Sequence, residues 1–180
     1  MLIQSKTRKM KGAIFFTGKF GSTKQYAQWI SEATGFPVFD LNKEIPDSTD
    51  YDLLILGSSV FIGKLTISKW AKSNWKIIKD KSIILYSVSG TEPGHPDLKK
   101  YITDSLPKEI IQRIKYVPLR GRLIMDKLPW WTRLILRIGS LGEKDPDTQK
   151  RMTQGFDFME KSNIEPIIKW VRSKQKSVLV

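Results

Sequence analysis

Five short apolar runs, separated by helical patterns, constrain the fold of this chain more than any other feature. They occupy Ala13 to Phe16, Pro37 to Leu41, Leu53 to Leu56, Ile83 to Val88 and Tyr116 to Leu119. Because the apolar residues follow one another without alternation, the runs are typical of strands that helices cover on both faces of a parallel sheet. The sequence therefore predicts an α/β fold with right-handed crossover connections.

Helical periodicity fills the intervals between these runs. In the first interval, Tyr26, Ile30 and Ala33 share one stripe, and Gly35 stands where helices commonly end. The other helices are expected over Thr66 to Ile78, after His95 with a break near Pro107, and over Ile164 to Val171.

The chain has the size of one domain. Its 180 residues with 40% hydrophobic content support one substantial core, so we expect a single domain over residues 1–180. Residues from about 120 to 153, after the fifth apolar run, do not fit the alternating pattern. Connections in α/β folds usually have about 2 to 6 residues, and longer ones are usually functional or disordered. We interpret this stretch as an insertion.

Composition excludes several kinds of site. The chain has no cysteine, which excludes disulfides, thiolate nucleophiles and cysteine-ligated metals, and His95 is its one histidine, which disfavours a histidine-built metal site. The net charge of +13 favours anionic lipid, nucleic acid or acidic small molecules as partners. No nucleic-acid motif accompanies the charge, so we expect no nucleic-acid partner.

The sequence predicts a cytoplasmic protein, either free or resting on the inner face of the cell membrane. The N-terminal stretch MLIQSKTRKMKGAIFF is basic, but its apolar run from Ala13 to Phe16 is too short for a signal peptide. No segment approaches the roughly 20 apolar residues of a membrane-spanning helix.

The turn after the first apolar run predicts an anion site. Thr17, Gly21, Ser22 and Thr23 lie between a strand and a helix, where backbone N–H groups and hydroxyls meet the positive end of the helix dipole, and Lys19 adds charge at the rim. The alternative is that Ser22 only caps the helix and Gly21 only makes the turn. The loop has neither the Gly-Lys-Ser/Thr order of a triphosphate-binding loop nor the G-x-G-x-x-G pattern of dinucleotide sites.

Two further strand ends carry similar loops. GSSVFIGK follows the third apolar run as residues 57–64, and SVSGTEPGH follows the fourth as residues 87–95. Ligands of open α/β sheets bind beyond the carboxyl ends of the strands, where the strand order reverses. Three such loops at one edge of the sheet favour a ligand site over three unrelated turns.

These three loops resemble those of the flavodoxin-like family. The spacing Thr17-x-x-x-Gly21-x-Thr23, the GSSVFIGK and YSVSG segments and the late basic insertion are similar to its menaquinone-dependent protoporphyrinogen oxidase branch. The resemblance implies a five-stranded parallel sheet of order 2-1-3-4-5, with helices on both faces and an insertion after strand 5. It also implies bound FMN, held by Thr17, Lys19, Phe20, Gly21, Ser22, Thr23, Ser58, Ser59, Val60, Phe61, Ile62, Gly63, Ser87, Val88, Ser89, Gly90 and Thr91.

The resemblance implies an FMN-dependent oxidoreductase that passes electrons from protoporphyrinogen, or another small redox substrate, to a quinone. An NAD(P)H-quinone reductase and an electron-transfer protein without its own substrate are the alternatives. Flavodoxins that carry electrons are generally acidic, so the charge of +13 disfavours a carrier. The residue covering the flavin stays open between Phe61 and Ile62, and the sequence assigns no catalytic acid or base. Glu92 and His95 are more simply interpreted as solvated loop residues.

The insertion contains a basic and aromatic segment. Residues 108–139 carry eight basic and two acidic residues, a net charge of +6, around the stretch LPWWTRLILRIG. Its composition is typical of a helix lying in a membrane interface, and the alternative is a helix packed on the domain's own flank. The basic tail from Lys169 to Lys176 adds to lipid attraction or is simply solvated. The residues that we expect to contact membrane or substrate are Arg120, Arg122, Trp130, Trp131, Arg133 and Arg137.

Overall fold

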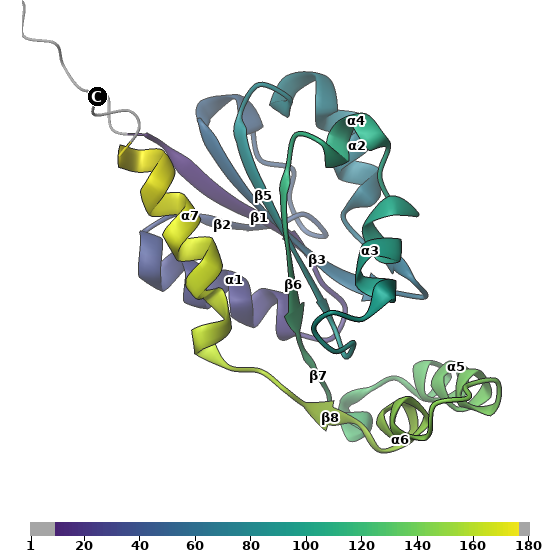
Figure 1. Ribbon diagram of the computed structural model, residues 1–180. Helices are drawn as coiled ribbons and strands as arrows, with labels where there is room; N and C mark the ends of the chain where they lie inside the picture. The colour runs from purple at the N-terminus through teal and green to yellow at the C-terminus, as the bar shows by residue number, and fades with distance from the viewer. Residues whose placement is uncertain (1–9, 177–180) are drawn as a thin grey trace, which may run out of the picture.

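A mostly parallel sheet forms the centre of the protein. A computed structural model describes residues 10–176, so the basic stretch before Met10 lies outside the described residues. Five strands run in the order β2-β1-β3-β5-β6, and the short β4 pairs antiparallel with β3 (Figure 1). Their bounds are β1 Gly12–Thr17, β2 Val38–Asp40, β3 Leu53–Phe61, β4 Lys64–Leu65, β5 Ser82–Ser89 and β6 Lys115–Arg120.

Helices cover both faces of this sheet (Figure 1). α1 (Ser22–Thr34) and α7 (Glu165–Lys176) pack on one face. α2 (Ser68–Ile78), α3 (Pro96–Thr103) and α4 (Lys108–Ile111) pack on the other. Short 3₁₀ turns lie at Ser48–Asp50 and Lys161–Ile164.

The first strand shows why the apolar runs do not alternate. Ala13 and Phe15 point into the core under α2, α3 and α4, whereas Ile14 and Phe16 point into the core under α1 and α7. All four residues are buried. Since each face has its own core, every position of the strand gains from burial, at about 1.5–3 kcal/mol for a large apolar side chain. The predicted α/β fold with strand order 2-1-3-4-5 is confirmed.

The third strand is longer than the sequence suggested. The loop expected from Gly57 continues as strand to Phe61, because Ser58 pairs with Thr17 of β1 and Ser59 pairs with Val88 of β5. The chain then turns at Ile62 and Gly63, with φ of 49° and 69°, and returns as β4. Two positive φ angles are the geometry of a tight hairpin turn, and a β-branched residue rarely adopts one.

The insertion is an ordered unit beyond the carboxyl end of β6 (Figure 1). It begins with β7 and ends with β8, which pair antiparallel as a separate two-stranded sheet, so its two ends lie side by side. None of the helices over residues 10–176 has both the length and the apolarity for crossing a bilayer. The elements of the insertion are β7 Arg122–Leu123, a 3₁₀ turn Met125–Lys127, α5 Trp130–Leu141, α6 Pro146–Gln154 and β8 Phe156–Asp157.

Candidate functional site

The first loop leaves the N-terminus of α1 open. Gly21 precedes the helix with φ of 88°, no side chain caps the first turn, and no acidic residue lies in it. A Cβ at Gly18 would lie 3.1 Å from Thr23 Cβ, so the loop packs closely on the helix. Free N–H groups and the helix dipole then face outward together, with Lys19 exposed at the rim. This arrangement fits a phosphate group.

A cluster of hydroxyl groups lies beneath this loop, and Thr66 is at its centre. The Thr66 hydroxyl is 2.7 Å from that of Thr17 and 3.3 Å from those of both Ser58 and Ser59. The hydroxyls of Thr17 and Ser58 therefore have protein partners, and they brace the ends of β1 and β3. Sequence analysis missed the role of Thr66, because it placed this residue in the following helix. Its position just after the GSSVFIGK loop was the available signal.

The second loop touches the first through an aromatic ring. The Nζ atom of Lys19 lies 3.7 Å from the centre of the Phe61 ring, and the rings of Phe20 and Phe61 are 6.2 Å apart. The cation over the ring face stabilises this contact. Ile62 at the turn is 71% exposed, whereas Val60 packs toward the core. Of the two candidates for covering a flavin ring, Phe61 faces the first loop and Ile62 faces solvent.

The third loop is held by two tyrosines. The hydroxyls of Ser87 and Tyr116 are 2.6 Å apart, and those of Thr91 and Tyr101 are 3.0 Å apart. Burial raises the pKa of both Tyr116 and Tyr101, so both phenols stay protonated at neutral pH. The loop also forms an inner turn, in which the Thr91 N–H donates to the Ser89 hydroxyl. Val88 is buried at the end of the strand.

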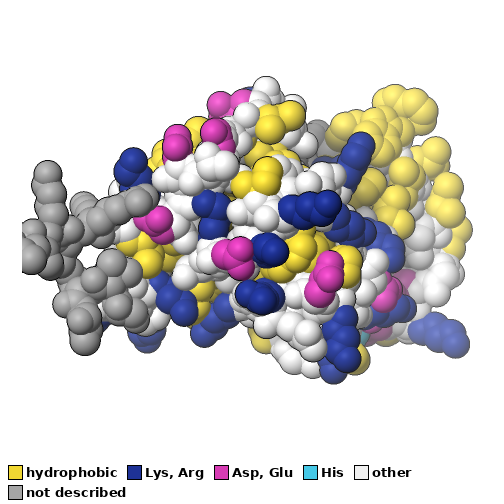
Figure 2. Space-filling view, turned by 90° about the horizontal axis from the view of Figure 1, so that it is seen from above, with side chains coloured by type: hydrophobic (Ala, Val, Ile, Leu, Met, Phe, Trp, Pro, Cys, Tyr) yellow, Lys and Arg dark blue, Asp and Glu magenta, His cyan; other side chains and the backbone are white. Residues whose placement is uncertain are grey.

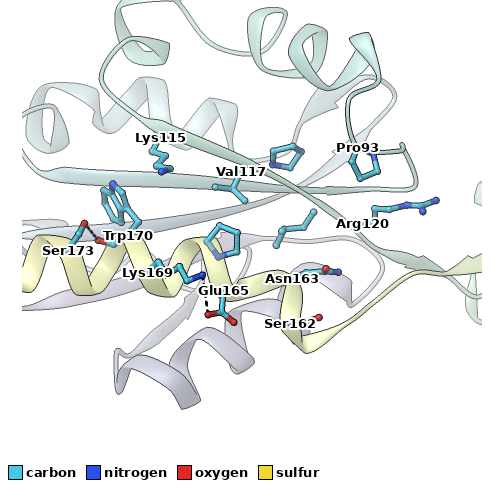
Figure 3. A pocket seen from close by; sticks show the side chains of 13 residues that line it. Pro93, Lys115, Val117, Arg120, Ser162, Asn163, Glu165, Lys169, Trp170 and Ser173 are labelled. Carbon is cyan, nitrogen blue, oxygen red and sulfur yellow. Dashed lines mark hydrogen bonds and ion pairs between the residues drawn. The ribbon is translucent and has the colours of Figure 1, made fainter.

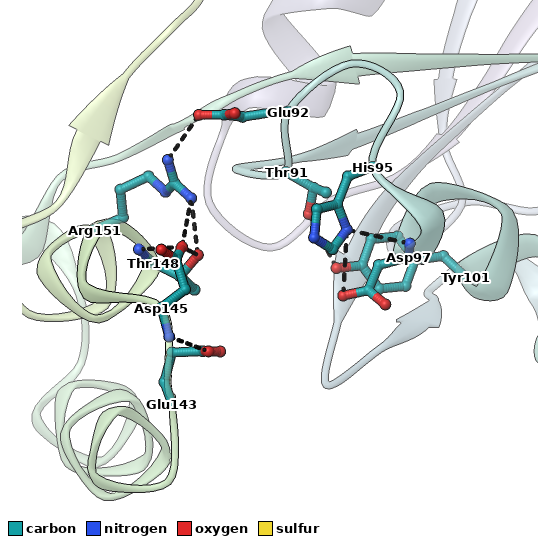
Figure 4. A network of polar contacts seen from close by, with 9 residues as sticks. All are labelled: Thr91, Glu92, His95, Asp97, Tyr101, Glu143, Asp145, Thr148 and Arg151. Carbon is teal, nitrogen blue, oxygen red and sulfur yellow. Dashed lines mark hydrogen bonds and ion pairs between the residues drawn. The ribbon is translucent and has the colours of Figure 1, made fainter.

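Three contacts are among those that attach the insertion to the start of α1 and to the third loop. The Ser22 hydroxyl bonds the backbone of Arg122. The ring of Phe156 packs so closely on Gly90 that a Cβ there would lie 2.6 Å from it. The third point is an ion pair between Arg151 of α6 and Glu92 (Figure 4).

Glu92 and His95 have structural partners. Nη1 of Arg151 donates to Glu92 Oε1 at 3.1 Å, and Nη2 of Arg151 donates to Thr148 Oγ1 (Figure 4). The Nδ1 atom of His95 accepts the N–H of Asp97 and so caps α3. Hydrogen bonds from Thr148 lower the pKa of Asp145, the N-cap of α6, so the cap is charged at neutral pH. These contacts favour structural roles for Glu92 and His95.

A pocket of about 450 Å³ opens between the first loop and the insertion. Lys19, Arg122 and Lys127 line it, and its lining contains no acidic residue. The side chain of Arg122 also approaches Asp157 at 4.0 Å. Thr132 of α5 lines the pocket as well, and the structure therefore joins Lys19 and Arg122, which sequence analysis treated as separate groups.

Helix α5 turns its small and polar side inward and its apolar side outward. Thr132 and Ser140 are 1% and 3% exposed, and Gly139 packs against Met152 of α6. The opposite side is exposed, including both tryptophans, and the expected arginines Arg133 and Arg137 are also exposed. The exposed apolar residues of α5 are Trp130, Trp131, Leu134, Ile135, Ile138 and Leu141.

This exposed apolar side has no cover within the part of the chain that the structure describes. Figure 2 shows hydrophobic side chains gathered at the right-hand end, the side on which Figure 1 places α5, with basic side chains beside them. A tryptophan pair 73% and 43% exposed does not cover the sheet. The alternative in which α5 lays its tryptophans on the domain's own flank is therefore not what the structure shows.

A larger hollow of about 820 Å³ lies at the open edge of the sheet, between β6 and α7 (Figure 3). Lys115, Lys169 and Trp170 line it together with Arg120. The guanidinium of Arg120 lies 3.4 Å from the centre of the Phe158 ring. Arg120 thus belongs to this hollow, whereas Arg122 belongs to the pocket beside the first loop.

Fold and site together define a class of protein. A sheet of order 2-1-3-4-5 with three loops at its carboxyl edge, the first opening onto an uncapped helix N-terminus, is the architecture of flavodoxin-like α/β proteins. Residues 13–149 match the model of a family described as flavodoxin domain, and the chain belongs to this family. No curated protein matches the sequence.

Solved structures are similar to this chain in fold. The flavo di-iron protein of Thermotoga maritima has a TM-score of 0.50 at 14% identity, over 93% of this chain and 36% of that chain. A Fusobacterium nucleatum flavodoxin bound to flavin mononucleotide has a TM-score of 0.49 at 14% identity, over 92% of this chain and 98% of that one. At such identities the likeness concerns the fold alone.

Proposed function

We propose that this protein is an FMN-dependent oxidoreductase of the membrane surface, which oxidises protoporphyrinogen and passes the electrons to a quinone. The observation that carries the flavin part is the open N-terminus of α1 behind Gly21, at the carboxyl end of β1. Membership of the flavodoxin-domain family supports FMN as the cofactor of this site. When bound, FMN would supply the redox chemistry, since the chain has no cysteine pair for two-electron exchange.

The chain's own residues bind and orient the cofactor. The first-turn N–H groups of α1 and the ammonium of Lys19 would hold the phosphate. The cluster around Thr66 fixes the ends of β1 and β3, so the N–H groups do not have to reorganise when the phosphate binds. Phe61 and the loop from Ser87 to Thr91 would lie beside the flavin ring.

The net charge and the insertion support an enzyme that acts on an acidic substrate at a membrane surface, rather than an electron carrier. With a net charge of +13, the protein attracts acidic substrates and anionic lipid. The exposed apolar side of α5, with Arg133 and Arg137 beside it, has the composition of an interfacial helix. A quinone acceptor dissolves in the bilayer, so a surface-bound enzyme meets it there.

The flavin part is tested on the purified full chain. We expect a yellow protein, or one that becomes yellow with added FMN. Because hydrogen bonds to charged groups stabilise by about 1.5–3 kcal/mol, Lys19→Glu is expected to weaken FMN binding at least tenfold. Lys79→Glu, an exposed lysine at the other end of the sheet, is the matched control and leaves binding unchanged. A colourless protein that FMN does not reconstitute contradicts the proposal.

The reaction is tested anaerobically with protoporphyrinogen and a menaquinone analogue. Turnover that needs both supports the proposed reaction. Quinone reduction with NAD(P)H but not with porphyrinogen identifies a quinone reductase instead. A flavin that passes electrons only to other proteins, with turnover of neither substrate, identifies a carrier.

A further inference from the structure

We propose that the hollow between β6 and α7 binds an organic dianion, a compound with an apolar body and an acidic group at each end. The hollow has a volume of about 820 Å³, which is in the range of small-molecule sites. It lies at the open edge of the sheet, and none of its lining residues is among those that we expect to hold FMN. The proposal is therefore independent of the flavin.

Cations lie at the two ends of this hollow. Lys115 begins β6 and Arg120 ends it, and Figure 3 shows the two side chains at opposite ends. Since a strand rises about 3.3 Å per residue, their backbones are about 16 Å apart. Lys169 pairs with Glu165 at 3.5 Å, whereas no carboxylate within residues 10–176 pairs with Lys115 or Arg120. Two anionic groups, one at each end, fit these two cations.

Arg120 is held in place by the base of the insertion. Its guanidinium lies 3.4 Å from the centre of the Phe158 ring, and this ring stacks on Phe156 with 5.2 Å between the ring centres. Phe156 in turn packs on Gly90 of the third loop. A ligand that meets a cation already held in this way loses less conformational entropy than one that must order a free side chain.

The surface between the two cations is largely apolar. Val117 and Leu119 of β6 line it, and Pro166 and Trp170 of α7 line it from the helix side. The Trp170 ring is partly exposed, so its indole offers apolar area to a ligand. An apolar body between the acidic groups fits this surface.

An added peptide strand is the other occupant that an open sheet edge can take. Among the described strands, β6 pairs only with β5 in the main sheet. Pro118 lies in β6 and lines the hollow, and it has no N–H group to donate to an incoming strand. Recognition then depends on the side chains of the hollow rather than on backbone pairing, which favours a small dianion over an extended peptide.

The test follows the indole N–H signals of the purified full chain by NMR. Six tryptophans give six such signals, and Trp170→Phe identifies the one from Trp170. The dianion is 2,6-naphthalenedicarboxylate, the matched monoanion is 2-naphthoate, and the neutral control is 2-naphthalenemethanol. We expect the dianion to shift the Trp170 signal saturably and to bind about fivefold more tightly than the monoanion, which is the most that a second exposed ion pair contributes. The signals of Trp130 and Trp131 are expected to stay in place.

A charge variant locates the second acidic group. Lys115→Gln is expected to reduce the preference for the dianion over the monoanion to less than about twofold, because it removes the cation at one end. Lys108→Gln, at an exposed lysine of α4 outside the hollow, is expected to keep the preference. Both side chains are exposed, so both variants keep the fold.

Titrations with and without FMN separate this proposal from the flavin question. Equal affinity in both states supports a separate site, and dianion binding by a colourless protein supports it while contradicting the flavin proposal alone. Competition with FMN, equal affinity for the three naphthalenes, or an unchanged preference in Lys115→Gln would overturn the inference. A hexaglutamate peptide that shifts the Trp170 signal where the dianion does not would identify an acidic protein segment as the occupant and would overturn it as well.

Discussion

The hydroxyl of Ser22 holds both backbone polar groups of Arg122. It accepts the Arg122 N–H at 3.0 Å and donates to the Arg122 carbonyl at 3.2 Å. The two residues are 100 positions apart, and the contact fixes the first strand of the insertion to the start of α1. The phosphate loop and the insertion are therefore one structural unit.

Ser22→Ala is expected to lower the free energy of unfolding by about 1–3 kcal/mol, because it leaves both backbone groups of Arg122 without this partner. Chemical denaturation measures the change. Ser162→Ala, at an exposed serine, is the control and stays within about 0.5 kcal/mol of the native chain. Equal stability of both variants contradicts a role of Ser22 in holding the insertion.

Ile62→Asn is expected to stabilise the protein by about 1 kcal/mol. The φ of 49° strains a β-branched residue, Asn tolerates the angle, and a side chain that is 71% exposed loses little on replacement. Gly63→Ala at φ of 69° is the opposite control and is expected to destabilise. If Ile62→Asn stabilises the chain while weakening FMN binding, the strained turn serves the cofactor; a fall in stability contradicts the strain argument.

Replacing Trp130 and Trp131 together by Ser is expected to abolish flotation with vesicles that contain anionic lipid. Both tryptophans are exposed, so the fold survives while the interfacial area is lost. Replacing Ile45 and Ile77 by Ser removes two exposed apolar residues outside α5, and flotation is expected to persist. Equal flotation of the native chain and of both double variants would contradict the membrane proposal.

Stability is expected to fall as the pH rises above about 10, and Tyr86 contributes to this fall. Burial raises the pKa of Tyr86 above its usual value of 10.0. Above that value the unfolded chain loses the phenolic proton while the folded chain keeps it, so unfolding is favoured. Tyr86→Phe also removes the hydrogen bond from its hydroxyl to the Thr23 carbonyl. Circular dichroism should show lower stability at pH 7 but a shallower loss above pH 10; an unchanged slope contradicts this assignment.

Glu92→Gln is expected to keep turnover and to change the free energy of unfolding by less than about 1 kcal/mol. Its carboxylate pairs with Arg151, and exposed ion pairs contribute about 0–1 kcal/mol. Steady-state kinetics and thermal melting measure the two effects. A large loss of kcat with normal melting would instead indicate a catalytic role for Glu92.

The sheet was predictable because the residue patterns that specify its strands lie within short stretches of the sequence. Residues such as Ile14 and Phe15 are apolar at adjacent positions of an uninterrupted short run, which is typical of a strand with a core on each face. The glycine and hydroxyl residues after three strands likewise predicted the edge at which we propose that FMN binds. The extension of β3 beyond Gly57 was not predictable, since it depends on pairing with β1 and β5.

The sequence patterns determined the α/β class, the glycine and hydroxyl loops after three strands and the amphipathic character of the segment around Trp130, whereas the strand order followed from the family resemblance. Only the tertiary structure decided which side of α5 faces outward, how Thr66 joins the strand ends, and that Lys19 and Lys127 line one pocket. The physical reason is separation along the sequence, because periodicity and turn chemistry depend only on residues that are near neighbours in the chain. The insertion's orientation depends on contacts such as Ser22 with Arg122, which residue spacing does not encode.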